Sequence, residues 1–243
     1  MRRALALLAL AACTPEPPAQ APPLAASAIP AALPASATPS ATPAAPATVA
    51  VRYLALGDSF TAGTGSGPAA AFPVRLAERL RARGVPVTLE NLGVNGYTTD
   101  DLIARELPRV AGFAPTLVTL AIGANDLVHG SPLGRYRAQV HRILAAVVAA
   151  GVPAARIFVL PQPDWSRSPV AAGFGEPRAI AAQIEACNDA LRAEATAAGA
   201  RWVDLFPRMR RQAEAGMIAD DGLHPAARAY DEWAEDLLGP VLR

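Results

Sequence analysis

The feature that most constrains the fold is a regular alternation between short apolar runs and longer segments with helical spacing. The apolar runs, each of strand length, are 51–56, 85–89, 117–122, 156–160 and 202–206. The segments with helical spacing are 72–83, 100–110, 136–150, 177–198, 207–215 and 225–238. Continuous apolar strands separated by helices are typical of a parallel sheet covered on both faces. The pattern predicts an α/β fold, a three-layer α/β/α domain with a mainly parallel sheet of about five strands.

Composition changes sharply near residue 50, and this change predicts where the folded part begins. Residues 14–50 hold ten of the 24 prolines, no aromatic residue and a single charge, Glu16. Such a segment cannot bury enough apolar surface to offset the entropy of ordering, and its prolines favour an extended spacer. We expect a disordered linker over 13–50 and one folded domain over 51–243. A glycosylated stalk is the alternative for the linker, because Ser and Thr are present.

The amino terminus has the pattern of an export signal. Arg2 and Arg3 precede an apolar run over 4–12, which ends at Cys13. A basic segment followed by about 7–15 apolar residues is typical of a secretory signal peptide, and this run is too short to span a membrane. Residues 10–13 (LAAC) resemble the cleavage box of bacterial lipoproteins, in which the Cys is lipidated. The resemblance implies a signal peptide over 1–12 and a protein anchored through Cys13 to a bacterial membrane, facing the periplasm or the cell exterior; the alternative is an ordinary secretory signal.

The charge balance argues against one class of partner. The chain has 22 Lys+Arg, all of them Arg, and 21 Asp+Glu; Arg2, Arg3 and Glu16 lie before the folded part, which leaves 20 of each sign there. A domain without excess positive charge lacks the electrostatic attraction that supplies most nucleic-acid affinity. We therefore expect no nucleic-acid partner, although this balance leaves a local basic patch open.

Cysteines and glycines offer no cofactor site. The only Cys besides Cys13 is Cys187, which lies in a helical segment and is expected to be a buried structural thiol rather than a nucleophile. No intrachain disulfide is predicted. The three His are scattered, which disfavours a metal site, and the glycine-rich stretch over 57–67 lacks the Lys of a nucleotide-binding loop. We expect neither a metal nor a cofactor.

Polar motifs follow the first three predicted strands, and a fourth precedes the last helix. They are GDSFTAG at 57–63, NLGVNG at 91–96, GAND at 123–126 and DGLHP at 221–225. Ligands bind at the carboxyl ends of the strands in parallel α/β sheets, so a site is expected there. Within the first motif, Ser59 would lie on a strand-to-helix turn, where Gly57 permits a tight backbone. Ser59 is therefore the candidate nucleophile.

The candidate base is His224. Asp221 precedes it by three residues, and Pro225 follows as the start of a helix. This spacing can bring a carboxylate onto the imidazole Nδ1–H and leave Nε2 free for Ser59. Asp220 is the adjacent alternative carboxylate.

The other two histidines are weaker candidates. His141 lies in mid-helix beside Arg142 and is expected at the surface. His129 follows the GAND motif and could line the site, yet it has no acidic partner at a short fixed spacing. Asp126 is near it, but is better interpreted as an acceptor that stabilises the turn.

The four motifs together resemble those of the SGNH, or GDSL-type, hydrolase family of esterases and lipases, over nearly all of 51–243. The family name has Leu where this chain has Phe60. The resemblance implies a flavodoxin-like fold and a catalytic set of Ser59, Asp221 and His224, and it selects Asp221 over Asp220. It also implies an oxyanion hole made by the backbone N–H groups of Ser59 and Gly93 and the side-chain amide of Asn125.

Two features of this oxyanion hole follow from chemistry. A missing Cβ at Gly93 would let the backbone approach the substrate. The carboxylates of Asp58 and Asp126 would oppose an oxyanion, so both are expected to be structural.

The function implied is a serine hydrolase that cleaves carboxylic esters through an acyl-enzyme. The longest loop, 161–176, contains Trp165 and Phe174, which are candidate lining residues of an acyl pocket; the alternative is that they only pack the loop against the domain. The connection over 61–71 is mostly small residues and offers no bulky lid. We therefore expect a shallow site for short-acyl esters, such as acetylated sugars or small aryl esters.

Three other functions remain as alternatives. The first is a lysophospholipase or acyl-thioesterase acting on single-chain lipids. The second is a catalytically silent envelope-binding module of the same fold, which would be expected to lose Ser59 or His224. The third is a flavodoxin-like nucleotide or signalling domain, which the export signal and the pair of Asp221 and His224 disfavour.

Overall fold

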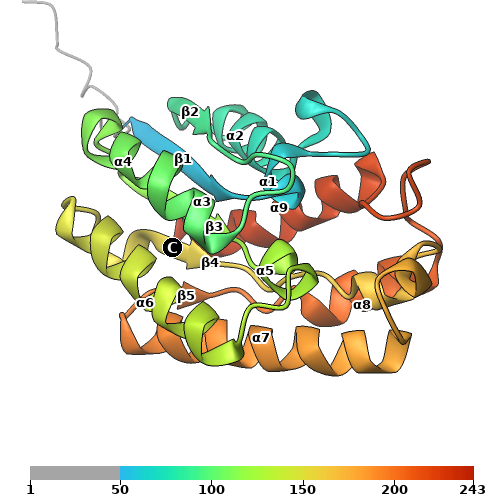
Figure 1. Cartoon of the computed structure of the whole chain (residues 1–243). Coiled ribbons are helices and arrows are strands. Elements are labelled where there is room, and N and C mark those ends of the chain that lie inside the picture. The colour runs from blue at the N-terminus through green and yellow to red at the C-terminus, as the bar shows by residue number, and fades with distance from the viewer. Residues whose placement is uncertain (1–49) are drawn as a thin grey trace, which may run out of the picture. The chain divides into compact units, whose positions relative to one another are not determined.

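The computed structural model describes residues 50–243 (Figure 1). The predicted signal peptide over 1–12, the lipidated Cys13 and the linker that follows lie outside the described residues. Within 50–243, every helix is too short or too polar to cross a membrane.

A five-stranded parallel sheet forms the centre of this part of the chain, as the alternating pattern predicted. Its strands are β1 (Val51–Gly57), β2 (Val87–Asn91), β3 (Leu117–Ala121), β4 (Ile157–Val159) and β5 (Arg201–Trp202). Their order in the sheet is β2-β1-β3-β4-β5, and all neighbouring strands pair in parallel. The strand order reverses between β1 and β3, which is where open α/β sheets bind ligands beyond the carboxyl ends of the strands.

Helices cover both faces of the sheet. They are α1 (Ser59–Ala62), α2 (Phe72–Ala82), α3 (Thr99–Asp101), α4 (Leu107–Phe113), α5 (Ala124–Val128), α6 (Leu133–Ala149), α7 (Pro177–Ala197), α8 (Phe206–Glu214) and α9 (Ala227–Leu242). A π-helical turn, Leu102–Glu106, joins α3 to α4. Short 3₁₀ turns lie at Pro68–Ala70, Ala154–Arg156, Trp165–Arg167 and Ala171–Gly173.

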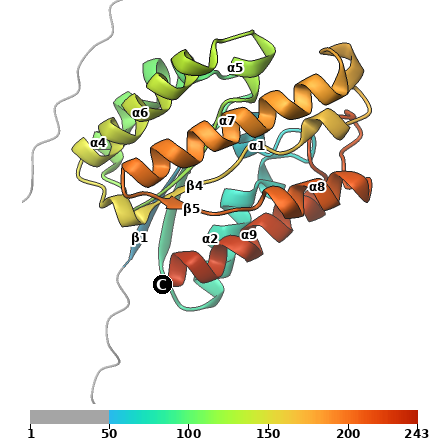
Figure 2. The same cartoon turned by 90° about the horizontal axis from the view of Figure 1, so that it is seen from below.

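The period of two along β1 divides its side chains between two buried clusters. Tyr53 and Ala55 belong to the cluster beneath α2 and α9, and Leu54 and Leu56 to the cluster beneath α4 and α6. Figure 2 shows α2 and α9 together on one side of the strands and α4, α6 and α7 on the other. Burial of β1 on both faces explains why its sequence is continuously apolar.

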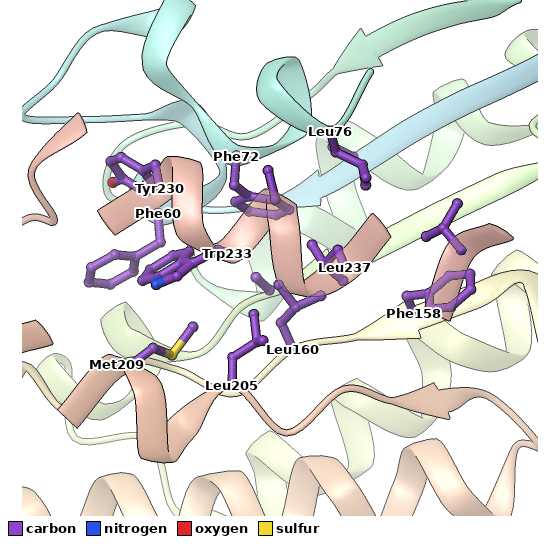
Figure 3. Close-up of a cluster of buried hydrophobic side chains, with 14 of the residues drawn as sticks. Phe60, Phe72, Leu76, Phe158, Leu160, Leu205, Met209, Tyr230, Trp233 and Leu237 are labelled. Carbon is purple, nitrogen blue, oxygen red and sulfur yellow. The ribbon is translucent and has the colours of Figure 1, made fainter. Parts of the chain in front are cut away.

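The cluster beneath α2 and α9 extends to the carboxyl end of β1 (Figure 3). Its aromatic centre is Trp233 of α9, whose ring centroid lies 6.1 Å from that of Phe72 and 5.1 Å from that of Tyr230. Phe60, the residue after Ser59, lies beside Trp233 in the same cluster. The first turn after β1 is therefore anchored directly in the core.

The observed strands differ from the predicted ones at β2 and β5. The strand predicted over 85–89 is observed two residues later, as β2 over Val87–Asn91. Just before it, the carbonyl of Pro86 accepts a hydrogen bond from the backbone N–H of Val51 in β1. The run predicted at 202–206 pairs only over Arg201–Trp202, because α8 already begins at Phe206 with a proline in its first turn.

The helices differ from the prediction mainly at their ends. Pro225 does not start the last helix: it forms an isolated antiparallel bridge with Ile218, so the backbone there is extended and α9 begins at Ala227. The predicted helix 100–110 is interrupted by the π-helical turn. The short helices α1 and α5 were not predicted as separate elements.

Candidate active site

Ser59 lies on a tight turn between β1 and α1, as expected. Gly57 ends the strand at φ 152°, a conformation that L side chains rarely adopt. A Cβ on Gly57 would lie 2.1 Å from the carbonyl oxygen of Ala121, so only glycine fits between β1 and β3. Ser59 is the first residue of α1, and Asp58 caps this helix by accepting a hydrogen bond from the N–H of Phe60 at 3.0 Å. The serine is thus held at the point where the strand order reverses.

Two buried carboxyl groups, those of Asp58 and Glu106, accept hydrogen bonds from backbone N–H groups of this turn. Burial raises the pKa of Asp58 to about 7, although the N–H of Phe60 opposes the rise. Glu106 comes from the π-helical turn, and its Oε2 accepts a hydrogen bond from the N–H of Gly57 at 3.0 Å. Burial raises the pKa of Glu106 to about 9, and the nearby Asp58 adds to the rise. Asp58 therefore acts as a helix cap, in agreement with the structural role expected for it.

Asp221 holds the imidazole of His224. Its Oδ2 lies 2.7 Å from Nδ1 of His224, while its Oδ1 accepts the backbone N–H groups of Leu223 and His224, each at 2.9 Å. Burial raises the pKa of Asp221, but these hydrogen bonds outweigh it, so the pKa is lowered overall. Asp220 is exposed. With Nδ1 on the carboxylate, the tautomer that leaves Nε2 unprotonated is favoured.

A single cleft brings Ser59 and His224 together. It has a volume of about 90 Å³. Its lining residues are Ser59, Phe60, Asn95, Ala124, Asn125, Val128, Trp165, Phe174, Leu223 and His224. They come from the first turn after β1, the loop after β2, α5, the 161–176 segment and the stretch before α9. The carboxyl ends of the strands therefore supply the site, as the motifs predicted.

Asn125 reaches the cleft from the first turn of α5. Its side-chain Nδ2 donates a hydrogen bond to the carbonyl of Tyr97 at 2.9 Å. This bond fixes the amide plane and leaves its second N–H for another acceptor. Asn95 and Val128 also line the cleft and were not among the candidate residues. Asn95 belongs to the motif that contains Gly93, which is the signal that could have identified it.

Gly93 is also required for packing within the protein. A Cβ there would lie 2.7 Å from both the backbone nitrogen of Ala62 and the Cβ of Thr61. The missing Cβ thus lets the loop after β2 pack against α1. The Gly93 N–H donates to Oδ1 of Asn91 at 3.1 Å, and the amide of Asn91 donates to the carbonyl of Thr61.

The remaining histidines and Asp126 lie outside the cleft. His141 is exposed, as expected, with Nδ1 3.1 Å from Oε2 of Glu194. His129 ends α5 and is not among the described residues that line the cleft. Asp126 is buried and accepts the N–H of Thr99 at 2.9 Å, so it is structural as predicted. Its partner, however, lies across the fold at the start of α3 rather than within its own turn.

Trp165 and Phe174 both line the cleft, and their ring centroids are 5.6 Å apart in an edge-on arrangement. Trp165 is 4% exposed and belongs to the core cluster, whereas Phe174 is 48% exposed. Trp165 therefore packs the segment against the domain and also lines the cleft. Phe174 contributes an exposed apolar face at the cleft mouth.

Cys187 does not line the cleft that contains Ser59 and His224. Cys187 is buried in α7, and burial raises the pKa of its thiol to about 11, as expected for a structural residue. Within residues 50–243, no group of three or more His, Cys, Asp or Glu side chains could hold a metal ion.

The comparisons with known proteins agree with this geometry. The sequence model of the GDSL-like lipase/acylhydrolase family matches residues 55–232. An arylesterase from Vibrio mimicus is 26% identical over 116 residues, which are 48% of this chain and 58% of the arylesterase, so the match spans little more than half of that relative.

Two solved structures share the fold. TesA is 25% identical with a TM-score of 0.64, covering 78% of this chain and 97% of TesA. Axe2, an acetylxylan esterase from Geobacillus stearothermophilus, is 18% identical with a TM-score of 0.64, covering 79% of this chain and 94% of Axe2. The family match confirms the resemblance inferred from the four motifs, and with it the expectation of a hydrolase of the esterase and lipase type. The chain belongs to the GDSL-like lipase/acylhydrolase family.

Proposed function

We propose that this protein hydrolyses carboxylic esters through an acyl-enzyme formed on Ser59. The observation that carries the proposal is the distance of 2.7 Å between Asp221 Oδ2 and His224 Nδ1, together with the position of His224 in the cleft that Ser59 also lines. His224 Nε2 takes the proton of Ser59 Oγ as this oxygen attacks the ester carbonyl. The protonated imidazole then gives its proton to the departing alkoxide, and a water molecule deacylates Ser59 by the same steps.

The negative charge of the tetrahedral intermediate requires donors. The backbone N–H groups of Ser59 and Gly93 and the free N–H of the Asn125 amide are the candidates. The Gly93 N–H donates to Oδ1 of Asn91, and Gly93 is not among the described residues that line the cleft, so the oxyanion would share or replace that acceptor. Loss of one such donor typically costs about 10²–10³ in rate.

The proposed substrates are short-acyl esters, for example acetylated sugars or small aryl esters. Support comes from the modest cleft, whose inner end is occupied by the rings of Phe60 and Trp165. An acetylxylan esterase shares the fold, and an arylesterase matches part of the sequence. Single-chain lipids or thioesters are the second candidate, favoured by the exposed Phe174 at the cleft mouth.

We also propose that the protein is exported and anchored through Cys13. The support is the basic and apolar start of the sequence and the position of Cys13 at its end. Several acyl chains on one residue give stable membrane binding, so Cys13→Ser should move most of the protein out of the membrane fraction. Unchanged membrane retention of this variant would contradict the anchor.

The catalytic proposal is tested with Ser59→Ala, His224→Ala and the double variant. Each single change should lower kcat/KM on p-nitrophenyl acetate by about 10⁴ or more, and the double change should be little worse, because the residues act as one unit. Additive losses would contradict a shared mechanism. Thr119→Ala, a buried polar change in β3 that removes a hydrogen bond to Tyr53 and lies outside the cleft lining, controls for loss of folding.

A series of p-nitrophenyl esters from acetate to palmitate tests the substrate class. We expect kcat/KM to be highest for the short acyl groups. A steady rise toward palmitate would overturn the short-acyl proposal and favour lysophospholipase or thioesterase activity.

A further inference from the structure

A second cavity adjoins the catalytic cleft. It is small, about 30 Å³, and most of its wall is apolar, including Met209, Met217, Ile218 and Trp233. Its charged and amide residues already have partners. Asp164 accepts from Arg167 at 2.8 Å, and the side chain of Gln212 bonds Trp233 and Glu232, each at 2.7 Å. We call this space the rear chamber.

The cleft and the rear chamber share three wall residues, Phe60, Trp165 and Leu223. A third and smaller cavity, about 10 Å³, lies next to the chamber and shares Met209 and Trp233 with it. Of the residues that line these spaces, Phe60 alone lines all three. Its side chain therefore forms, with those of Trp165 and Leu223, the wall between the catalytic cleft and the rear chamber, and it alone also borders the third cavity.

Phe60 is also well placed to meet an acyl chain. It follows Ser59 directly in α1, and its ring centroid lies 5.3 Å from that of His224. The ring is 4% exposed and lies beside Trp233, with Met209 close below (Figure 3). An acyl group that extended inward from Ser59 would reach this ring before it reached the chamber.

From this arrangement we propose that Phe60 is the residue that sets acyl-chain length, because its ring fills the space between the cleft and the rear chamber and so limits how far an acyl chain can extend from Ser59. The inference rests on the proposed ester hydrolysis and adds the residue that determines its selectivity. The chamber suits an alkyl chain because its methionines are flexible and adapt to apolar ligands. Two polar atoms at its wall residues, Trp165 Nε1 and Ser168 Oγ, are buried without a partner among the described residues, so water competes for the space.

The test replaces Phe60 with Leu and with Ala and measures kcat/KM on p-nitrophenyl acetate, butyrate and octanoate. Removing the ring joins the cleft to the chamber. We expect the ratio of octanoate to acetate to rise about tenfold, the equivalent of roughly two more buried methylene groups. Phe60→Leu keeps an apolar side chain in α1, so the ratio can still be measured with this variant if Phe60→Ala does not fold.

The matched control is Phe72→Leu. Phe72 packs in the same cluster and against the same Trp233, but it lines none of the three cavities. This variant should lose thermal stability as Phe60→Leu does, with the octanoate to acetate ratio unchanged. A second change, Ala213→Met, places atoms in the rear chamber and should return the ratio of Phe60→Leu toward the wild-type value.

The outcomes separate the two proposals. If the Phe60 variants are active and their octanoate to acetate ratio stays within twofold of wild type, the proposed role of Phe60 in chain-length selectivity is wrong. The proposed ester hydrolysis would then still stand. An equal rise in Phe72→Leu would also overturn the role of Phe60, because the effect would then be general loosening of the core. If the folded wild-type protein hydrolyses none of the esters, both the proposed function and the proposed role of Phe60 are wrong.

Discussion

The nucleophile turn and the 161–176 segment both line the cleft, but they are packed very differently. At the turn, a Cβ on Gly57 would lie 2.1 Å from a backbone oxygen, and one on Gly93 would lie 2.7 Å from a backbone nitrogen. In the 161–176 segment, a Cβ on Gly173 would meet nothing within 4 Å, and one on Gly175 would have its nearest neighbour at 3.8 Å. Close packing holds the turn that carries Ser59, whereas the part of the 161–176 segment around Gly173 and Gly175 keeps room to vary.

The largest effect is expected from Gly57→Ala. The new Cβ would clash with the carbonyl of Ala121, and the backbone at φ 152° is strained for any L side chain. We expect the free energy of unfolding to fall by about 3 kcal/mol or more, with loss of esterase activity. Urea unfolding followed by circular dichroism measures it. A stable and active Gly57→Ala protein would show that the turn is far less crowded than described.

Gly93→Ala should have an intermediate effect. Its backbone is not at positive φ, but a Cβ would lie within 3.0 Å of Ala62, Thr61 and the carbonyl oxygen of Asp58, so the loop after β2 must move away from α1. We expect a loss of about 1–3 kcal/mol in stability and, if the Gly93 N–H serves the oxyanion, about 10²–10³ in kcat. A stability loss without any loss of kcat in the folded protein would remove Gly93 from the oxyanion hole.

Glu106→Gln tests the carboxyl group beneath the turn through pH. The folded protein holds the Glu106 proton up to a pKa of about 9, whereas the unfolded chain releases it near the ordinary value of 4.5. The folded state thus binds more protons between these values, so stability falls as pH rises, by at most about 1.4 kcal/mol per pH unit. Gln keeps the acceptor for the Gly57 N–H but does not titrate.

The variant should therefore lose less stability than wild type between pH 5 and pH 9, in urea unfolding measured at several pH values. Glu78→Gln, at an exposed position, is the control and should follow wild type. Parallel curves for Glu106→Gln and wild type would mean that Glu106 is ionised in the folded protein.

The smallest effect is expected from Gly173→Ala. An added methyl group meets open space, and the residue lies in a 3₁₀ turn rather than at positive φ. Stability should stay within about 0.5 kcal/mol of wild type, with kcat on acetate esters unchanged. If Gly173→Ala lowered the free energy of unfolding as much as Gly57→Ala, the 161–176 segment would be packed as closely as the nucleophile turn.

Much of the fold was predictable because β1 and β3 are buried on both faces and therefore continuously apolar. The ends of the sheet were not, because β2 and β5 lie at its edges, where pairing depends on neighbours rather than on hydrophobicity. The short helix α1 escaped prediction because four residues carry no period, and its cap depends on the buried side chain of Asp58.

The candidate site was predictable where chemistry fixes the residue type, as for Ser59, Asp221 and His224. The roles of Gly93 and Glu106 were not. Gly93 is required by α1, a contact between distant segments. Glu106 lies in a segment with ordinary helical spacing, and only the π-helical turn brings its carboxyl group to Gly57.

The most direct test of the central claim is the reaction of the protein with a fluorophosphonate, followed by peptide mass spectrometry. The reagent forms a stable tetrahedral adduct only with a serine that a neighbouring base activates. We expect one adduct, on the peptide that contains Ser59; it should be absent in Ser59→Ala and should form far more slowly in His224→Ala. A folded protein that is not labelled, or is labelled at another residue, would contradict it.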